Sequence, residues 1–400
     1  MTDASVEAAP RPTRGETWLG FTAGFVLVLT PILGYLAPLA FAPLMGIAGV
    51  MALPLLRRRW GSILPLAPLV LLAIWALISL DWSPYIDLKP KAALENALKL
   101  PLQLALYGSA VLAFAQLAAR SARRAQAVLA GGAGALALIL FVDALLGATL
   151  YQAVKQAIGE PIRPDLARRN IAQGNYVLAV LFWPAAVAAW RSGWKLAAPG
   201  AGLLLIGASG LLGADAPILA LVLGGAAFAA VRYGGRIAGL AFIPPIALYF
   251  VLTPILTLEA ARGGLFAWLH RVVGQSWDAR LDIWAFSAAK VLEKPALGWG
   301  FDASRTFDPA IPLHPHNAAL QLWLELGAIG AALGAVFFCC TAFSLANRAE
   351  ENRVEAAAGF GALIAYLTIG AISFGVWQEW WLGLGALGAC SCILLHRSRG

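Results

Sequence analysis

Charged residues are scarce in this chain of 400 residues. Asp, Glu, Lys and Arg together make up 12% of it, whereas 60% of its residues are hydrophobic. An average soluble domain is about 25% charged. No soluble core of this size could absorb so much apolar surface and leave so few polar residues to cover it. The composition therefore excludes a soluble enzyme and predicts an all-α polytopic membrane protein.

Cysteine is scarce too, and all four cysteines lie inside apolar runs: Cys339, Cys340, Cys390 and Cys392. We expect small core residues there, and neither a disulfide framework nor a zinc site. The net charge of +8 is then first a topology signal, because basic residues are retained on the cytoplasmic side of a membrane. Nucleic-acid binding is a poor interpretation of it. The polar N-terminal segment 1–16 shows no signal-peptide cleavage site, so we expect the first span to direct insertion.

Twelve segments are long and apolar enough to be predicted as membrane spans. They are 17–36, 38–56, 62–80, 99–119, 126–146, 171–190, 196–213, 215–231, 237–256, 317–345, 355–376 and 379–396. Arginines and lysines cluster at every second boundary between these segments. This alternation predicts a single membrane domain, 1–400, in a bacterial inner membrane with both termini in the cytoplasm.

Three longer segments fall on the opposite, periplasmic side. They are 81–99, a second periplasmic loop at 147–170, and a long periplasmic loop at 257–316. The long loop shows helical spacing of apolar residues at 261–272 and 280–294, where Pro295 ends the second helix. Both helices are too short and too charged to cross the bilayer, so we expect them on its outer surface or against the bundle. An ordered outer loop of this length favours a functional site.

The strongest local pattern is HPHNAALQLWLELGAIG, which begins at His314. Asn317 is placed to cap the following helix, and Gln321 and Glu325 continue one polar face along it. A polar stripe of this kind is expected to face the bundle or a wet cavity. The plainer alternative is an interface histidine, His316, above a stripe that only holds helices together. Three glycines are predicted to allow close helix packing below the stripe: Gly327, Gly330 and Gly334.

The same segment resembles a known family. His316-Asn317, nine residues, and then Gly327-x-x-Gly330 are similar to the HN-x9-G-x-x-G signature of the bacterial O-antigen ligase and polymerase superfamily. The stretch ARLDIWAFSAAKVLEKPALGWGFD at 279–302 looks like that family's arginine, aromatic helix, proline and Gly-x-Gly turn. DWSP at 81–84 is a weaker likeness. The chain departs from the family at 167–180, without Asn-Pro-Asn, and at 213–217, where GADAP replaces a Ser-Arg pair.

The resemblance implies a membrane glycosyltransferase that takes a glycan from undecaprenyl diphosphate on the periplasmic face. The residues support the same chemistry. Arginine donates in pairs to a diphosphate, so we predict diphosphate binding by Arg280, His314 and Arg168 or Arg169. Arg280 would also stabilise the charge of the leaving group, and His316 is the predicted general base for the acceptor hydroxyl. The predicted supporting residues are Asn317, Gln321 and Glu325.

The acceptor stays open at this point. By resemblance it is the lipid A core, which would make the chain an O-antigen ligase. An O-antigen or exopolysaccharide polymerase with the same chemistry is the close alternative, and protein O-glycosylation is a third. A lipid-linked oligosaccharide flippase or transporter is a more distant alternative, because transporters tend to show paired repeats and the long loop has no counterpart in the other half of the chain.

No cofactor is expected, and metal binding is predicted to be absent. Asp81 and Asp87 lie six residues apart in the first outer segment, which is weak evidence for a metal site beside a diphosphate. Asp143 falls inside a predicted span and is expected to be structural, with a partner that satisfies its carboxylate. The remaining outer arginines are expected mainly to keep the loops hydrated: Arg163, Arg262, Arg271 and Arg305.

Overall fold

The computed structural model describes residues 13–56 and 64–398. In these ranges it contains helices and no strand, which confirms the predicted all-α class. The α-helices are α1 Arg14–Leu36, α2 Phe41–Ala52, α3 Ala67–Ile78, α4 Pro84–Leu88, α5 Pro90–Ala115, α6 Ala119–Leu145, α7 Thr149–Ala157, α8 Pro164–Arg191, α9 Ala197–Leu212, α10 Asp215–Ala241, α11 Ile243–Arg262, α12 Leu265–Val272, α13 Gln275–Glu293, α14 Ala318–Glu351, α15 Arg353–Ile372 and α16 Glu379–Arg397. Short 3-10 turns lie at Pro38–Ala40, Leu53–Leu55, Leu64–Leu66, Ser79–Trp82 and Ala303–Thr306.

The helices account for the predicted spans. Within the described ranges, ten helical segments are long and apolar enough to cross a membrane, and the segments 67–82 and 197–212 are shorter apolar helices. Each of the twelve predicted spans overlaps one of these twelve segments, and residues 62 and 63 of the predicted span 62–80 lie outside the described residues. The chain is therefore a polytopic membrane protein.

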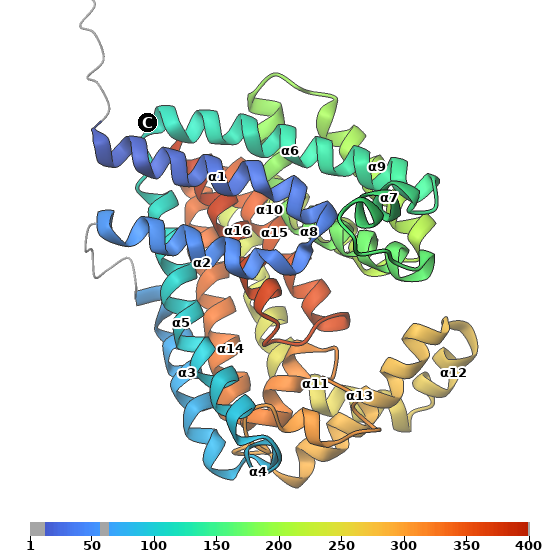
Figure 1. The fold of residues 1–400 in the computed structure, drawn as a ribbon. Coiled ribbons are helices and arrows are strands. Elements are labelled where there is room, and N and C mark those ends of the chain that lie inside the picture. Colours follow the sequence, from blue (N-terminus) through green and yellow to red (C-terminus); the bar gives the residue numbers. More distant parts are fainter. Residues whose placement is uncertain (1–12, 57–63, 399–400) are drawn as a thin grey trace, which may run out of the picture.

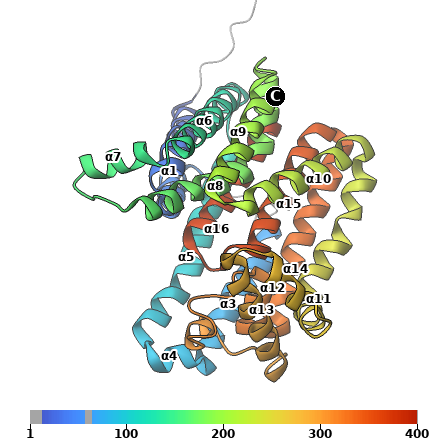
Figure 2. The same cartoon turned by 90° about the vertical axis from the view of Figure 1, so that its right-hand side faces the viewer.

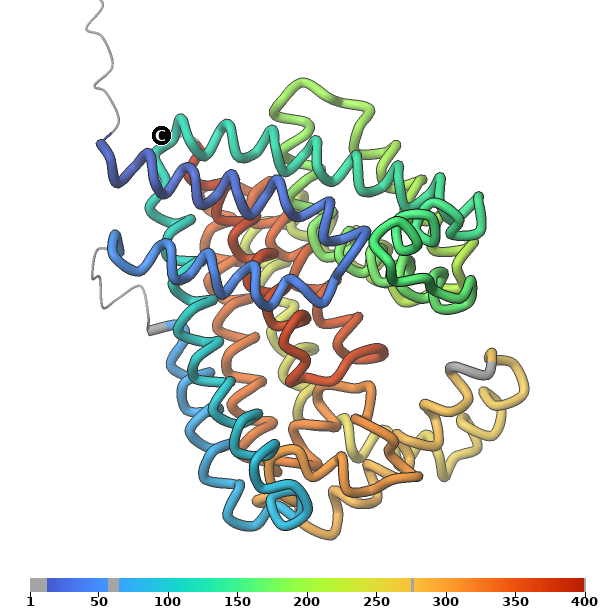
Figure 3. Tube along the Cα trace, viewed as in Figure 1, coloured from blue at the N-terminus to red at the C-terminus, as the bar shows by residue number. Residues whose placement is uncertain are grey.

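The two ends of the described chain lie on the same side of the molecule. The start of α1 and the C-terminal end of α16 are close to one another in both views, whereas α4, α12 and α13 lie at the opposite end (Figures 1 and 2). The trace in Figure 3 follows α13 into the long segment before α14, at the lower right of that view. Helices α10 and α15, α11 and α14, and α2 and α5 pack against each other along their lengths.

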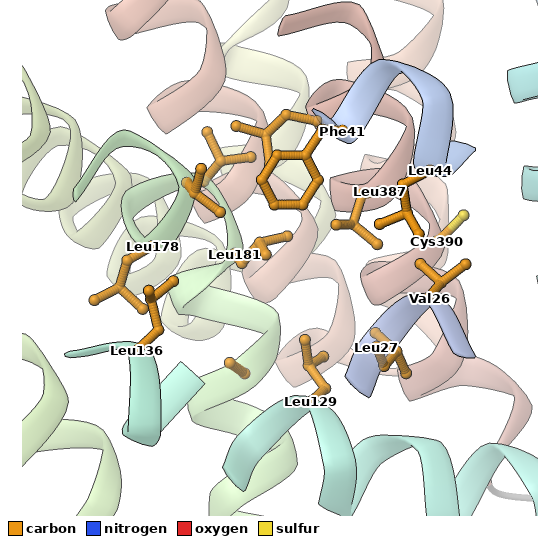
Figure 4. Packing of buried hydrophobic residues seen from close by; sticks show 14 of the residues in the cluster. Val26, Leu27, Phe41, Leu44, Leu129, Leu136, Leu178, Leu181, Leu387 and Cys390 are labelled. Carbon is orange, nitrogen blue, oxygen red and sulfur yellow. The ribbon is translucent and has the colours of Figure 1, made fainter. Parts of the chain in front are cut away.

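One apolar core joins the N-terminal helices to α16. Leu27 of α1, Phe41 of α2, Leu136 of α6 and Leu387 of α16 are all buried and converge in Figure 4. Close backbone approach supports this packing, as is usual between membrane helices. A Cβ on Gly383 would lie 2.7 Å from the carbonyl oxygen of Phe41.

The prediction that the cysteines are core residues is right for Cys390 and wrong for Cys340, which is exposed, whereas Cys339 and Cys392 are half-buried. All four are free, and Cys390 is completely buried in the core shown in Figure 4. Asp143 also has the expected structural role. Its buried carboxylate accepts hydrogen bonds from the Tyr35 hydroxyl at 2.7 Å and from the N–H groups of Leu150 at 2.8 Å and Tyr151 at 3.1 Å. It therefore caps the start of α7.

Several helix ends differ from the prediction. Helix α5 begins at Pro90, well before the predicted 99, because its first turns are polar yet helical, with Lys91 and Glu95 3.9 Å apart. The predicted helix 261–272 is divided: α11 continues to Arg262, and Gly264 with φ +80° separates it from α12. The predicted helix 280–294 begins earlier, at Gln275, and ends at Glu293.

Candidate active site

Helix α14 is interrupted at Gly327. This residue has φ +64° and ψ −161° inside the helix. The interruption frees carbonyl oxygens that an unbroken helix would use itself. The Leu324 carbonyl accepts the Trp299 N–H at 2.8 Å, and the Glu325 carbonyl accepts the Gly300 N–H at 2.7 Å. The segment before the histidines is thus hydrogen-bonded directly into the middle of α14.

Gly327 therefore does more than the predicted close packing. A Cβ at this position would overlap the Ala296 carbonyl, and a Cβ on Gly298 would lie 2.5 Å from the Glu325 carbonyl. The Ala328 N–H continues the pairing by donating to the Pro295 carbonyl at 2.9 Å. The first glycine of the signature is required because the backbone reverses and another backbone touches it there.

The Glu325 carboxylate binds groups from three segments of the chain. It is completely buried and accepts four hydrogen bonds. The donors are the Asp302 N–H at 3.1 Å, the Ser304 hydroxyl at 2.6 Å, the Gln321 amide at 3.0 Å and the Trp377 indole at 2.6 Å. A buried carboxylate is tolerated when its lone pairs are used in this way. Glu325 thereby joins α14 to the segments on both sides of it.

The loop between α15 and α16 is fastened over the same helix. The Val376 N–H donates to Gln321 Oε1 at 2.9 Å. A Cβ on Gly375 would lie 2.8 Å from the His314 ring, so only glycine fits between the loop and that ring. The predicted stripe on α14 therefore faces this loop and not lipid. Asn317 caps α14, as predicted, by accepting the Leu320 N–H at 3.0 Å.

Both ring nitrogens of His314 are occupied. Its Nδ1 accepts the His316 N–H at 3.1 Å, so a neutral His314 carries its proton on Nε2. That Nε2 lies 2.8 Å from the Gln378 side-chain amide. Gln378 Oε1 is a buried atom with no partner among the described residues. When the Gln378 side-chain amide is rotated by about 180°, its Oε1 accepts the hydrogen bond that the His314 Nε2–H donates. This orientation is the consistent one, because the oxygen and nitrogen of an amide are assigned from their hydrogen-bond partners.

His316 is arranged differently. Its Nδ1 lies 2.8 Å from the Ser373 carbonyl oxygen, which can only accept a hydrogen bond, so Nδ1 carries the proton. Its Nε2 then holds a lone pair, and the described part of the chain supplies no partner for it. His316 also has φ +55°, in the left-handed region that few non-glycine residues adopt. Such conformations concentrate at functional sites.

Both histidines are kept neutral. The pKa of His314 is lowered to about 3, first by burial and then by the neighbouring His316 ring and the charges of Arg305 and Arg280. The pKa of His316 is also lowered, first by burial and then by Arg280, although its bond to the Ser373 carbonyl acts in the opposite direction. His316 is therefore an uncharged acceptor at neutral pH.

Arg280 lies on α13 beside this pair. The Trp284 indole, one turn further along α13, donates to the Pro315 carbonyl at 2.9 Å and fixes the helix next to the histidines. The Arg280 guanidinium stacks on the Trp277 ring, 5.0 Å from its centroid. Burial lowers the pKa of Arg280, yet a guanidinium remains charged at neutral pH. Arg280 is thus close enough to His314 and His316 for its charge to lower the pKa of both rings.

The two arginines of α8 are placed unequally. Arg168 donates from Nη2 to the Leu211 carbonyl at 2.6 Å, which caps the end of α9. Arg169 lies two helical turns before Tyr176 and so on the same face of α8. Tyr176 is within electrostatic range of Arg280, and its ring meets Phe374 of the loop between α15 and α16 at 4.8 Å. Arg169 therefore lies on the face of α8 that carries Tyr176, and Tyr176 is close to the histidine site.

Sequence reasoning missed several site residues. Tyr176, Trp377 and Gln378 were not singled out, because nothing in their sequence context shows which loop they contact. Arg305 was expected only to hydrate its loop. Instead it donates to Asp302 Oδ1 at 3.0 Å and contributes positive charge at His314. Its position between Gly300 and the histidines was the available signal.

Metal-type residues do not gather in the described part of the chain. Residues 13–56 and 64–398 contain no group of three or more His, Cys, Asp or Glu side chains placed to hold a metal ion. Asp81 and Asp87, the weak candidates from the sequence, are both exposed.

A known family model matches the region that contains this site, and several known proteins match part of the chain. The family model described as O-Antigen ligase matches residues 200–335. Three relatives carry the name of a candidate polysaccharide ligase. The protein of Rickettsia prowazekii (strain Madrid E) is 39% identical over 119 residues, which cover 26% of this chain and 28% of that protein. The protein of Rickettsia typhi is 36% identical over the same shares, and that of Rickettsia conorii is 37% identical over 122 residues, with 26% and 29% covered.

The alignments thus span less than a third of the relatives' length. The matched region of the family model includes Arg280, both histidines and the break at Gly327, but not the arginines of α8. The resemblance deduced from the HN-x9-G-x-x-G pattern is confirmed. Residues 200–335 of the chain are thus similar to the O-antigen ligase family.

Proposed function

We propose that this protein is a membrane glycosyltransferase that moves a glycan from undecaprenyl diphosphate to an acceptor hydroxyl on the periplasmic face. The observation that carries the proposal is the state of His316. Its Nδ1 proton is held by the Ser373 carbonyl, its Nε2 lone pair is free among the described residues, and its pKa is lowered. These are the properties of a general base that works at neutral pH.

The reaction needs three groups in this site. His316 Nε2 removes the proton of the acceptor hydroxyl, and the hydroxyl oxygen forms a new bond to C1 of the donor sugar. The bond between C1 and the diphosphate oxygen breaks, and undecaprenyl diphosphate leaves with the electron pair. Arg280 is proposed to stabilise the negative charge of that leaving group, with Arg169 as the second candidate cation. His314 is proposed to position His316 through its bond to the His316 N–H.

Ligation to the lipid A core is the most specific form of the proposal. The family description and the relatives' names favour a polysaccharide ligase. A polymerase of the same superfamily would use the same three groups, so the acceptor has to be measured. A flippase would not need an uncharged base beside an arginine.

The deciding experiment expresses wild-type protein and His316→Gln in a strain that lacks the gene. We expect wild-type protein to restore long glycan chains on the lipid A core, and His316→Gln to leave free core, because glutamine cannot take the proton. If the strain that expresses His316→Gln instead makes lipid A cores that carry a single glycan repeat, the protein is a polymerase. Normal ligation by His316→Gln at equal expression would refute His316 as the base.

Arg280 provides a second test of the same proposal. Arg280→Lys keeps the charge but loses the planar pair of donors that fits a diphosphate. We expect transfer by Arg280→Lys and Arg280→Ala to fall roughly a hundred- to a thousandfold. Transfer of labelled glycan in membranes measures this. Arg262→Lys, an exposed arginine paired with Glu259, is the matched control and should leave transfer unchanged.

The proposed chemistry uses no divalent metal, because the arginines supply the positive charge. Transfer by purified protein is therefore expected to continue in a strong chelator. Loss of transfer that magnesium or manganese restores would contradict this and direct attention to Asp81 and Asp87.

A further inference from the structure

A polar cavity lies far from the histidine site. Its volume is about 410 Å³, within the range of small-ligand sites. It is lined by Arg123, Gln126, Arg191, Ser192, Asn352 and Ser398. These residues belong to α6, to the ends of α8 and α16, and to the start of α15.

The cavity and the histidine site lie at opposite ends of helix α8. Arg191 closes α8, whereas Arg169 lies near its start. At 1.5 Å per residue the two arginines are roughly 33 Å apart along that helix, about the thickness of the hydrocarbon layer. A ligand in this cavity therefore cannot be the glycan donor bound at His316.

The charge of the cavity is incompletely compensated. Arg191 donates to the Glu355 carboxylate at 2.6 Å and to the Leu395 carbonyl at 2.7 Å. Arg123 makes no ion pair with any described residue, and it uses one of its five N–H donors, on the Ser398 carbonyl at 3.1 Å. The cavity thus contains one cation without an acidic partner among residues 13–56 and 64–398.

Neutral donors complete the cavity wall. Asn352 uses its carboxamide oxygen to accept the N–H groups of Val354 and Glu355, which leaves its NH2 group as a donor. Ser192, whose hydroxyl can donate, lines the same space. Guanidinium, amide and hydroxyl donors around one cavity fit a tetrahedral oxyanion. Basic pockets between membrane helices on the cytoplasmic side are known to take phospholipid headgroups.

We propose that this cavity binds a phosphate group, with Arg123 as its principal ligand. The phosphate can belong to the headgroup of an anionic phospholipid or be a free ion. Bound there, it would join the ends of α8 and α16 to the beginnings of α6 and α15, and so stabilise the bundle on the side opposite the histidines.

The experiment compares wild-type protein with Arg123→Gln and Arg124→Gln. Arg124 is the next residue on α6, is exposed and does not line the cavity, so its variant is a matched charge control. Thermal unfolding midpoints are measured in neutral detergent with inorganic phosphate, and with chloride at equal ionic strength. They are also measured in nanodiscs of phosphatidylcholine with or without phosphatidylglycerol.

We expect phosphate or phosphatidylglycerol to raise the midpoints of wild type and Arg124→Gln. For Arg123→Gln the required concentration should be roughly tenfold higher or more, because a charged donor is lost. A response to phosphatidylglycerol alone assigns the phosphate to a lipid, and a response to inorganic phosphate assigns it to a free ion. Equal responses of the two variants, or a wild-type response no greater than that to chloride and phosphatidylcholine, would overturn the proposal.

Wild-type protein alone gives a second measurement if Arg123→Gln does not fold. Hydrogen exchange of the amides at 388–398 should slow when the effective probe is added, because the phosphate would bridge Arg123 to the end of α16. Unchanged exchange in this segment with both probes would also overturn the proposal.

Discussion

The two histidines of the HPHN segment are proposed to have different roles because their ring nitrogens contact different groups. His314 is held by the His316 N–H on one side and by Gln378 on the other. His316 is held only through Nδ1, by the Ser373 carbonyl. The sequence could identify the pair as a site, since both rings lie at the start of a span. It could not show which groups hold each ring, because Ser373 and Gln378 lie more than fifty residues further along the chain.

The first prediction concerns the pH dependence of transfer. The pKa of His316 is lowered from its ordinary value of 6.5, so the base stays unprotonated to more acidic pH than a free histidine. We expect the rate to be constant above pH 6.5 and to fall only below it, as the ring takes up a proton. The measurement is transfer of labelled glycan in membranes from pH 5 to 8. A midpoint at or above 6.5 would contradict the prediction.

The second prediction separates Arg168 from Arg169. Arg168→Gln removes the cap on the Leu211 carbonyl and should lower the thermal midpoint slightly, with transfer within a few-fold of wild type. Arg169→Gln should lower transfer by roughly tenfold or more, because a charged donor to the diphosphate is worth about 1.5–3 kcal/mol. Transfer rate and thermal midpoint are measured for both variants. The opposite result, a large loss of transfer in Arg168→Gln and not in Arg169→Gln, would make Arg168 the diphosphate ligand.

At the level of the helices, hydrophobicity predicted where spans exist but not where helices end. Charge marks the water boundary, and a helix continues through it, as α5 does from Pro90 past Lys99. The break in α14 also could not be predicted from the sequence. A glycine in an apolar helix looks the same whether it packs against a neighbour or has positive φ. Only the contact with Ala296 and Gly298 distinguishes the two at Gly327.

The third prediction tests this break. Gly327→Ala places a side chain in a conformation that is almost confined to glycine, which costs about 1–3 kcal/mol, and its Cβ would overlap Ala296. We expect a clearly lower thermal midpoint and loss of transfer. Gly210→Ala in α9 is the control, since a Cβ there meets nothing within 4 Å and alanine favours a helix. Equal midpoints for the two variants would show that the break is not needed.

At the level of the whole molecule, the alternation of basic residues predicted the side of each loop. The structure places the starts of α1 and α6 and the end of α16 together, away from α4, α12 and α13 (Figures 1 and 2). The histidine site and the arginine cavity consequently lie at opposite ends of the same helices.

The fourth prediction is the topology itself. Reporter fusions at 165 and 290 should report the periplasm, and fusions at 350 should report the cytoplasm. A fusion at Gly193, in the turn after α8, is the internal control and should agree with 350. A cytoplasmic signal at 290 would place Arg280 on the wrong side for a periplasmic donor.

The bonds of Glu325 also have a consequence for the synthesis of the protein. Asp302 and Ser304 precede Glu325 in the chain, but Trp377 follows it by 52 residues. At ordinary translation speeds of 5–20 residues per second, this donor emerges about 3–10 s later. During that interval the Glu325 carboxylate enters the insertion machinery before Trp377, one of its hydrogen-bond donors, has been synthesised. A nascent chain stalled before residue 377 should therefore be a preferred substrate for membrane quality-control proteases, whereas one stalled after 398 should not.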